Sequence, residues 1–181
     1  MQNQKLSENQ KKDFMKKAAF IADNSLCNYK VGCVGVIKDV GQQITHHALN
    51  DPYVRRKRGF IYVKSWNETL KGEIYCQNFD KDGKRICVRV EENLKGSKDI
   101  HKVCSSHAEI GLIAKCARYG IPTEEMIVFQ TNSPCYICAK ALIQAKISEL
   151  YYMAKHTDTS GLEILKKNGI STKIIRQDSV F

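Results

Sequence analysis

Residues 126–153 read MIVFQTNSPCYICAKALIQAKISELYYM, and this stretch decides the fold class. Residues 126–130 and 149–153 are short apolar runs, which are typical of buried strands. Between them, over residues 135–146, apolar side chains recur at the three- and four-residue spacing of one helix face. The stretch therefore predicts a strand, a helix and a second strand in succession.

The same alternation continues on both sides of this unit. Residues 106–119 have the apolar spacing of a helix, and Gly120 is its stop signal. Residues 161–168 predict a further helix, and residues 172–175 predict a last strand. Strands that alternate with helices imply a mainly parallel sheet covered by helices, which is an α/β fold.

The N-terminal third predicts a helix followed by two strands. Residues 7–10 read SENQ, a capping box that begins a helix fading near residue 24. Residues 31–37 are a β-branched run and predict a buried strand. We expect residues 42–48 to pair back on it as a second strand after a turn at residues 39–41.

Residues 51–104 differ in character from the rest of the chain. They begin with the basic cluster Arg55-Arg56-Lys57-Arg58. Residues 74–79 and 85–90 predict the strands of a hairpin around Asp82-Gly83, and residues 93–102 predict a loop. We therefore expect one domain over residues 1–181 with an insertion at about 51–104.

Composition excludes several classes of protein. The 181 residues are 43% hydrophobic and 27% charged, which is too apolar for a disordered chain. No apolar run approaches the roughly 18 residues of a membrane span. The polar N-terminus lacks a secretory signal, so the eight cysteines favour free or metal-bound thiols in the cytoplasm over a disulfide framework. The net charge of +10 favours anionic partners.

Two short motifs carry the chemistry. The first is His107-Ala108-Glu109, and the second runs from Pro134 through Cys135 to Cys138. One imidazole and two thiolates can hold tetrahedral zinc and leave the fourth position for water. A Cys-x-x-Cys pair alone is also found in redox proteins and in structural zinc sites. Both motifs together, each at the start of a predicted helix, favour a catalytic zinc bound by His107, Cys135 and Cys138.

Glu109 has a separate predicted role. It lies two residues past His107, so on the first turn of a helix it points in a different direction from the metal ligand. We expect its carboxylate to accept a proton from the attacking water and to return it to the substrate.

With these motifs the sequence resembles the cytidine deaminase superfamily, and the deoxycytidylate deaminase branch most closely. The resemblance covers residues 14–50 and 106–175, including DTSGLEIL at residues 158–165. It implies a three-layer α/β/α sandwich with a five-stranded mixed sheet and an inserted hairpin or loop region. It also implies zinc-dependent hydrolytic deamination of a cytosine nucleotide, with dCMP as the expected substrate and a homo-oligomer as the expected assembly.

The resemblance also implies substrate-binding positions. The family places an asparagine after the second strand, and Asn50 matches that position, although Asn50-Asp51-Pro52 also reads as a simple turn. The backbone around Ser133 is expected to contact the exocyclic amine. The other expected contacts in this motif region are Ala108 and Pro134.

For three further sets of residues, the sequence allows either a functional or a structural role. Arg55 and Arg58 can clamp a substrate phosphate or lie in a solvated loop. Tyr152 can stack on a base or be a buried strand residue. Gly111 stands where the family has asparagine, and it either leaves room beside the pocket or permits close helix packing.

The insertion carries one more candidate site. A second, structural zinc is an alternative there, with candidate ligands that match no standard finger: Cys76, Cys87, His101 and Cys104. Two rival functions also stand. One is a deaminase acting on cytosine or adenine in nucleic acid, favoured by the basic charge. The other is a catalytically silent scaffold subunit, against which the intact Glu109 argues.

Overall fold

The computed structural model describes residues 6–42, 44–45, 48, 50–57, 59–69, 79–84, 86–87 and 105–181. In chain order the elements are α1 (Glu8–Ala22), β1 (Gly32–Lys38), β2 (Val54–Lys57), β3 (Phe60–Trp66), β4 (Glu68–Thr69), β5 (Ser105–Ser106), α4 (Ala108–Tyr119), β6 (Ile127–Asn132), α5 (Tyr136–Gln144), β7 (Glu149–Ala154), α6 (Ser160–Lys167), β8 (Ser171–Ile174) and the 3-10 turn η3 (Gln177–Ser179). Among the helices in these ranges, none has the length and apolar character needed to cross a membrane.

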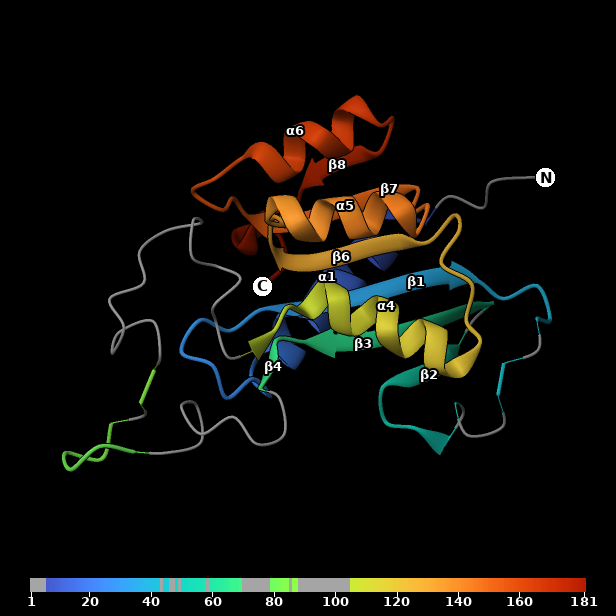
Figure 1. Ribbon diagram of the computed structural model, residues 1–181. Coiled ribbons are helices and arrows are strands. Elements are labelled where there is room, and N and C mark those ends of the chain that lie inside the picture. The colour runs from blue at the N-terminus through green and yellow to red at the C-terminus, as the bar shows by residue number, and fades with distance from the viewer. Residues whose placement is uncertain are drawn as a thin grey trace.

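A six-stranded sheet forms the middle layer, in the order β2-β3-β1-β6-β7-β8. β6, β7 and β8 run parallel, whereas β1 is antiparallel to both β3 and β6. Helices α4 and α5 cover one face, and α1 covers the other (Figure 1). The predicted three-layer α/β class with a mixed sheet is confirmed, with six strands in this sheet instead of five.

Each face of the sheet has its own apolar core, because successive strand residues point to opposite sides. In β6, Val128 packs on the side of α4 and α5, together with Leu112 and Leu142. Its neighbour Phe129 packs on the side of α1, against Phe14. Alternation within one strand therefore anchors helices on both faces.

Helix α1 begins where the capping box predicts. Ser7 Oγ accepts a hydrogen bond from the backbone N–H of Gln10, and Gln10 Oε1 accepts one from the backbone N–H of Ser7. These two bonds satisfy N–H groups that have no partner inside the helix.

The predicted strand at residues 42–48 is wrong. Of its described residues, Gln42, Ile44 and Thr45 are not in a strand, and Ala48 is helical. The next strand in the chain that pairs back on β1 is β3, over all seven residues from Gly32 opposite Trp66 to Lys38 opposite Phe60. Because β3 directs Ile61 and Val63 into the core, it buries more apolar surface than residues 42–48 could.

The boundaries expected for the insertion overlap the sheet. Residues 54–66 lie inside the expected insertion at 51–104, yet they form β2 and β3 of the central layer. The turn predicted at Asp82-Gly83 is present, with Asp80 Oδ1 accepting from the backbone N–H groups of Asp82 and Lys84. Most of the predicted hairpin strands and the whole loop at residues 93–102 lie outside the described residues.

Gly111 serves close packing. A Cβ atom at this position of α4 would lie 2.6 Å from Ser65 Oγ of β3. The absence of a side chain therefore lets α4 approach the sheet, which agrees with the packing interpretation of this glycine.

Candidate active site

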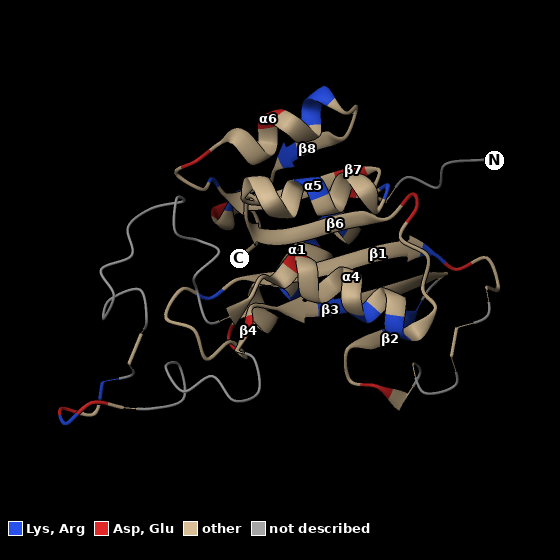
Figure 2. Ribbon diagram, in the orientation of Figure 1, with Lys and Arg blue, Asp and Glu red and all other residues tan. Residues whose placement is uncertain are grey.

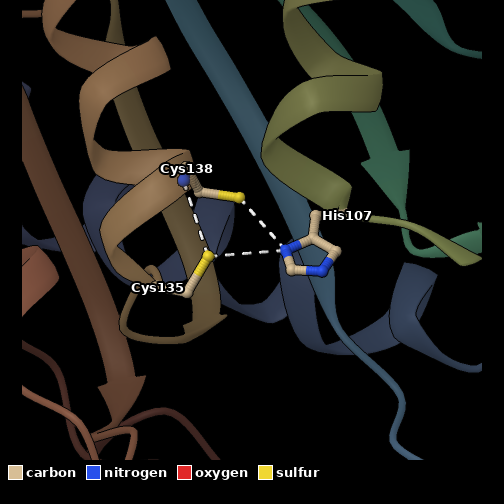
Figure 3. Close-up of side chains that lie close together, drawn as sticks. All are labelled: His107, Cys135 and Cys138. Atoms are coloured by element: carbon tan, nitrogen blue, oxygen red, sulfur yellow. Dashed lines mark hydrogen bonds between the residues drawn. The ribbon is translucent and has the colours of Figure 1, made fainter. Parts of the chain in front are cut away.

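Two helix N-termini meet at one end of the sheet. His107 is the N-cap residue of α4, and Cys135 is the N-cap residue of α5. Cys135 Sγ accepts a hydrogen bond from the backbone N–H of Cys138 at 3.5 Å. The three side chains point toward one another from the two helices (Figure 3). Helix N-termini carry partial positive charge, so this end of each helix favours thiolates.

The geometry of the three donors fits a zinc ion. His107 Nδ1 lies 3.2 Å from Cys138 Sγ and 3.6 Å from Cys135 Sγ. Tetrahedral zinc with typical Zn–N and Zn–S bonds separates a nitrogen and a sulfur ligand by about 3.5 Å. The cluster holds three donors among the described residues, which leaves one tetrahedral position for a ligand from solution. The predicted ligand set is therefore brought together.

Cys135 is the first of the two thiols to ionise. The hydrogen bond from the Cys138 thiol, which is the largest cause, lowers the pKa of Cys135 to about 4, although burial opposes it and His107 assists it. The same hydrogen bond, together with burial, raises the pKa of Cys138. A bound cation favours the second thiolate as well, because both sulfurs then face positive charge.

Glu109 lies beside the cluster without belonging to it. It is in the first turn of α4, where Figure 2 shows acidic colour at the start of the helix, and its side chain is buried. Burial is the main cause that raises the pKa of its carboxyl group. A buried carboxyl group with a raised pKa is suited to accept and return a proton near neutral pH.

A cavity of about 70 Å³ opens beside these groups. Its walls come from the segment before β1, the residue after β3, the start of α4, the end of β6 and the segment after β7. The residues that line it are Cys27, Tyr29, Val31, Asn67, Ser105, His107, Ala108, Glu109, Asn132, Ser133, Cys135 and His156.

The predicted substrate-binding residues divide into two groups. Ala108 and Ser133 line the cavity. Pro134 is buried beside it, and Tyr152 is buried in the apolar core under α4 and α5, which agrees with the structural interpretation of that tyrosine. Arg55 is exposed on β2, outside the cavity lining. Arg58 lies outside the described residues.

Asn50 is also absent from the cavity lining. It is exposed and helical, and none of the described residues between 39 and 48 is in a strand. The residue that directly follows β3 is Asn67, which is buried and lines the cavity. The misplacement of Asn50 follows from the misassigned second strand, because both predictions depended on the same segment.

Asn67 holds the segment before β1 against the sheet. Its Oδ1 accepts from the backbone N–H of Val31 at 2.8 Å, and its Nδ2 donates to the backbone carbonyl of Tyr29 at 2.8 Å. The hydroxyl of Ser25 donates to the backbone carbonyl of Asn67 at 2.8 Å. This side chain therefore positions the wall of the cavity that carries Tyr29.

Sequence reasoning also missed His156. Its backbone N–H donates to Ser133 Oγ at 2.7 Å, which ties the segment after β7 to the motif before α5. Its Nδ1 accepts from the backbone N–H of Asp158 at 3.2 Å. A nitrogen that accepts carries no proton, so the neutral ring has its proton on Nε2. A histidine outside both motifs has no local signal that would have marked it.

The candidate second zinc site is mostly outside the described residues. Cys87 is buried, whereas Cys76, His101 and Cys104 are not described. The second site therefore stays a prediction.

Residues 8–154 match the sequence profile described as "Cytidine and deoxycytidylate deaminase zinc-binding region". The chain belongs to this family. Both metal motifs lie within the match, and the family consists of zinc-dependent hydrolytic deaminases acting on C–N bonds. The predicted family and zinc cofactor are thereby confirmed.

Known relatives agree with this membership. ComE operon protein 2 of Bacillus subtilis (strain 168) is 26% identical over 128 residues, which are 70% of this chain. The chain spans 59% of the length of that relative. Crystal structures of the dCMP deaminase of cyanophage S-TIM5, in apo form and in complex with dCMP and dUMP, have TM-scores of 0.62 and 0.63 at 24% and 22% identity. They cover 94% of this chain and 100% of theirs, and they share its fold.

Proposed function

We propose that this deaminase acts on a cytosine mononucleotide and converts dCMP and water to dUMP and ammonia. The observation that carries the proposal is the cavity lined by His107, Cys135 and the buried Glu109, beside the cluster that Cys138 completes as the third metal donor. The cyanophage enzyme of the same fold is described in complex with dCMP and dUMP, which supports the choice of nucleotide.

The protein residues divide the work of the reaction. His107, Cys135 and Cys138 hold zinc, which when bound lowers the pKa of a water ligand from about 15.7 to near 7. Glu109 accepts a proton on its carboxylate from the attacking water. It delivers this proton to the pyrimidine N3, then takes the remaining proton from the hydroxyl of the C4 adduct and delivers it to the C4 amine, which leaves as ammonia as the C4 carbonyl forms.

His156 supplies the phosphate contact in this proposal. Because its Nδ1 already accepts from Asp158, Nε2–H is the ring donor that remains for a ligand in the cavity. A phosphate oxygen accepts such a hydrogen bond, and the bond is strong because the acceptor is charged. This assigns to His156 the role that the sequence suggested for Arg55 or Arg58.

Tyr29 forms the aromatic wall for the pyrimidine ring. Its side chain is 47% exposed at the cavity, and Asn67 holds its backbone. An exposed aromatic face is suited to stacking on a base. The base contact expected of Tyr152 is thereby assigned to Tyr29.

Ammonia release from three substrates tests the proposal. We expect turnover of dCMP well above that of deoxycytidine and of single-stranded oligodeoxycytidylate. His156→Ala is expected to raise KM for dCMP by about tenfold or more, the effect of a lost hydrogen bond to a charged group, while KM for deoxycytidine changes little. Efficient turnover of the oligonucleotide without turnover of dCMP would establish the nucleic-acid alternative instead. No turnover of any substrate by zinc-loaded protein would favour the silent scaffold.

A further inference from the structure

A groove lies between α1 and β3, on the face of the sheet opposite to α4 and α5. Its volume is about 660 Å³, which is within the range of nucleotide-sized sites. A smaller cavity of about 250 Å³ adjoins it toward β2, and the two share Asp13, Lys17 and Tyr62. Helix α1 lies behind the sheet in Figure 1, so this groove is on the far face in that view.

The described lining of the groove is strongly basic. It includes three lysines, Lys16, Lys17 and Lys64, and a single acid, Asp13, and Lys57 lines the adjoining smaller cavity. Asp13 is already engaged by Lys17 at 2.7 Å, one helical turn away. The remaining lysines therefore present positive charge to a ligand.

The basic cluster of the sequence contributes to this face. Arg55 lies opposite Tyr62 in the β2–β3 register, so its side chain is on the same side of the sheet as Tyr62 and Lys64. Arg56 points to the other side and forms an ion pair with Asp39 at 2.7 Å. The alternation of the strand thus separates a paired arginine from one whose charge acts on Lys64 in the groove lining.

Aromatic side chains line the same groove. They are Phe20, Tyr53, Tyr62, Trp66 and Phe181. Phe20 is 77% exposed and Phe181 is 74% exposed, which is unusual for large apolar side chains. Lysines interleaved with exposed rings are the combination that single-stranded nucleic acid binds, because phosphates meet the charges and bases stack on the rings.

Lys64 adds an electrostatic argument. It is partly buried in the groove, and burial together with the nearby Arg55 lowers its pKa. A phosphate placed between these two cations would reduce their repulsion and replace lost hydration.

We propose that the groove between α1 and β3 is a binding site for single-stranded nucleic acid, separate from the deaminase cavity. The two described linings share no residue, and at the end of β3 Trp66 lines the groove whereas the next residue, Asn67, lines the cavity. The strand contacts Lys16 and Lys64 through its phosphates, and a base stacks on Phe20. A flat lipid surface does not enter a groove, and an acidic peptide supplies no regular series of planar rings.

Fluorescence anisotropy with labelled oligothymidylate tests this site in the full-length, zinc-loaded protein. The double variant Lys16→Glu/Lys64→Glu is expected to weaken binding by about tenfold for each lost phosphate contact. It should also reduce the slope of log K against log salt by about 0.7 per contact, because fewer counterions are released. Phe20→Ala should weaken binding without changing that slope, because stacking releases no counterions.

Lys167→Glu on the exposed surface of α6 is the matched control, since it makes the same charge change away from the groove. Unchanged affinity in the double variant, or an equal loss in the control, overturns the proposal. Displacement of the oligonucleotide by dTMP at equal phosphate concentration also overturns it, because the groove then takes a mononucleotide. Ammonia release from dCMP is measured in parallel and is expected to be the same in all variants, so failure here is distinct from failure of the proposed function.

Discussion

Gly161 of α6 lies directly against the carbonyl oxygen of Pro134: a Cβ atom at Gly161 would be 2.1 Å from that oxygen and 3.0 Å from the Cys135 carbonyl carbon. Both contacts are to backbone atoms, which cannot move away as the end of a flexible side chain can. The first turn of α6 is therefore packed on the peptide that carries the first metal-binding thiol. The position of Cys135 depends on a residue 26 positions later in the chain.

Gly161→Ala is expected to destabilise the protein and weaken zinc binding, because α6 must move away from the metal motif. Without a clash, alanine in a helix would instead stabilise it by about 1 kcal/mol relative to glycine, so the sign of the change is informative. Thermal unfolding and zinc content by atomic absorption measure both effects. Ser160→Ala, at the neighbouring half-buried helix position, is the control. A raised melting temperature with full zinc content in the Gly161 variant would refute the close-contact argument.

Glu109→Gln is expected to keep zinc and lose activity. The carboxylate lies outside the three-donor cluster, so the metal retains all its protein ligands. Loss of a positioned acid/base group typically lowers kcat by about 10²–10⁴-fold. Ammonia release and bound zinc are measured on the same sample, with Glu163→Gln on α6 as the control. Zinc loss in parallel with activity would show that Glu109 is a ligand.

Asn67→Ala is expected to cost about 1–3 kcal/mol of unfolding free energy, because the Val31 N–H and the Tyr29 carbonyl lose their partners. Asn67→Asp should cost less, since an aspartate still accepts from Val31 but cannot donate to Tyr29. Asn50→Ala is the matched control, at an exposed position outside the cavity lining. Urea unfolding compares the three variants. Equal stability of the Asn50 and Asn67 alanine variants would show that Asn67 does not hold the segment before β1 in place.

The buried thiol of Cys116 is expected to make the protein less stable at alkaline pH. Burial raises its pKa from 9.0 to about 12. Between these values the unfolded chain binds fewer protons than the folded chain, so stability falls as pH rises, by up to about 1.4 kcal/mol per pH unit for this thiol. Below the pKa of the unfolded state the thiol is protonated in both the folded and the unfolded chain, so none of this stability is lost.

Urea unfolding at about pH 8, 9.5 and 11 measures this dependence in the native protein and in Cys116→Ala. The substituted protein is expected to show a shallower decline over the same window, although it is less stable at neutral pH because of the cavity left by the sulfur. Parallel declines in the two proteins would mean that Cys116 is not responsible.

Local sequence determined the parts of this protein that depend on near neighbours in the chain. The capping box at Ser7 and the N-cap positions of His107 and Cys135 are set within one helical turn. The metal donors were predictable because each motif places its ligands at the beginning of one helix. The alternation of strands and helices after residue 105 then implied the parallel part of the sheet, since such connections are short and have one handedness.

Tertiary structure alone decided which asparagine reaches the cavity and where the basic cluster lies. Asn50 and Asn67 both follow a segment of strand-forming residues, and only the pairing of β1 with β3 brings Asn67 to the active site. The pairing of β2 with β3 places Arg55 on the side of the sheet that α1 covers, opposite to the helices that carry the metal ligands. Strand pairing is chosen by the apolar surface that the whole sheet buries, and that surface is a property of the assembled fold which no local stretch of sequence contains.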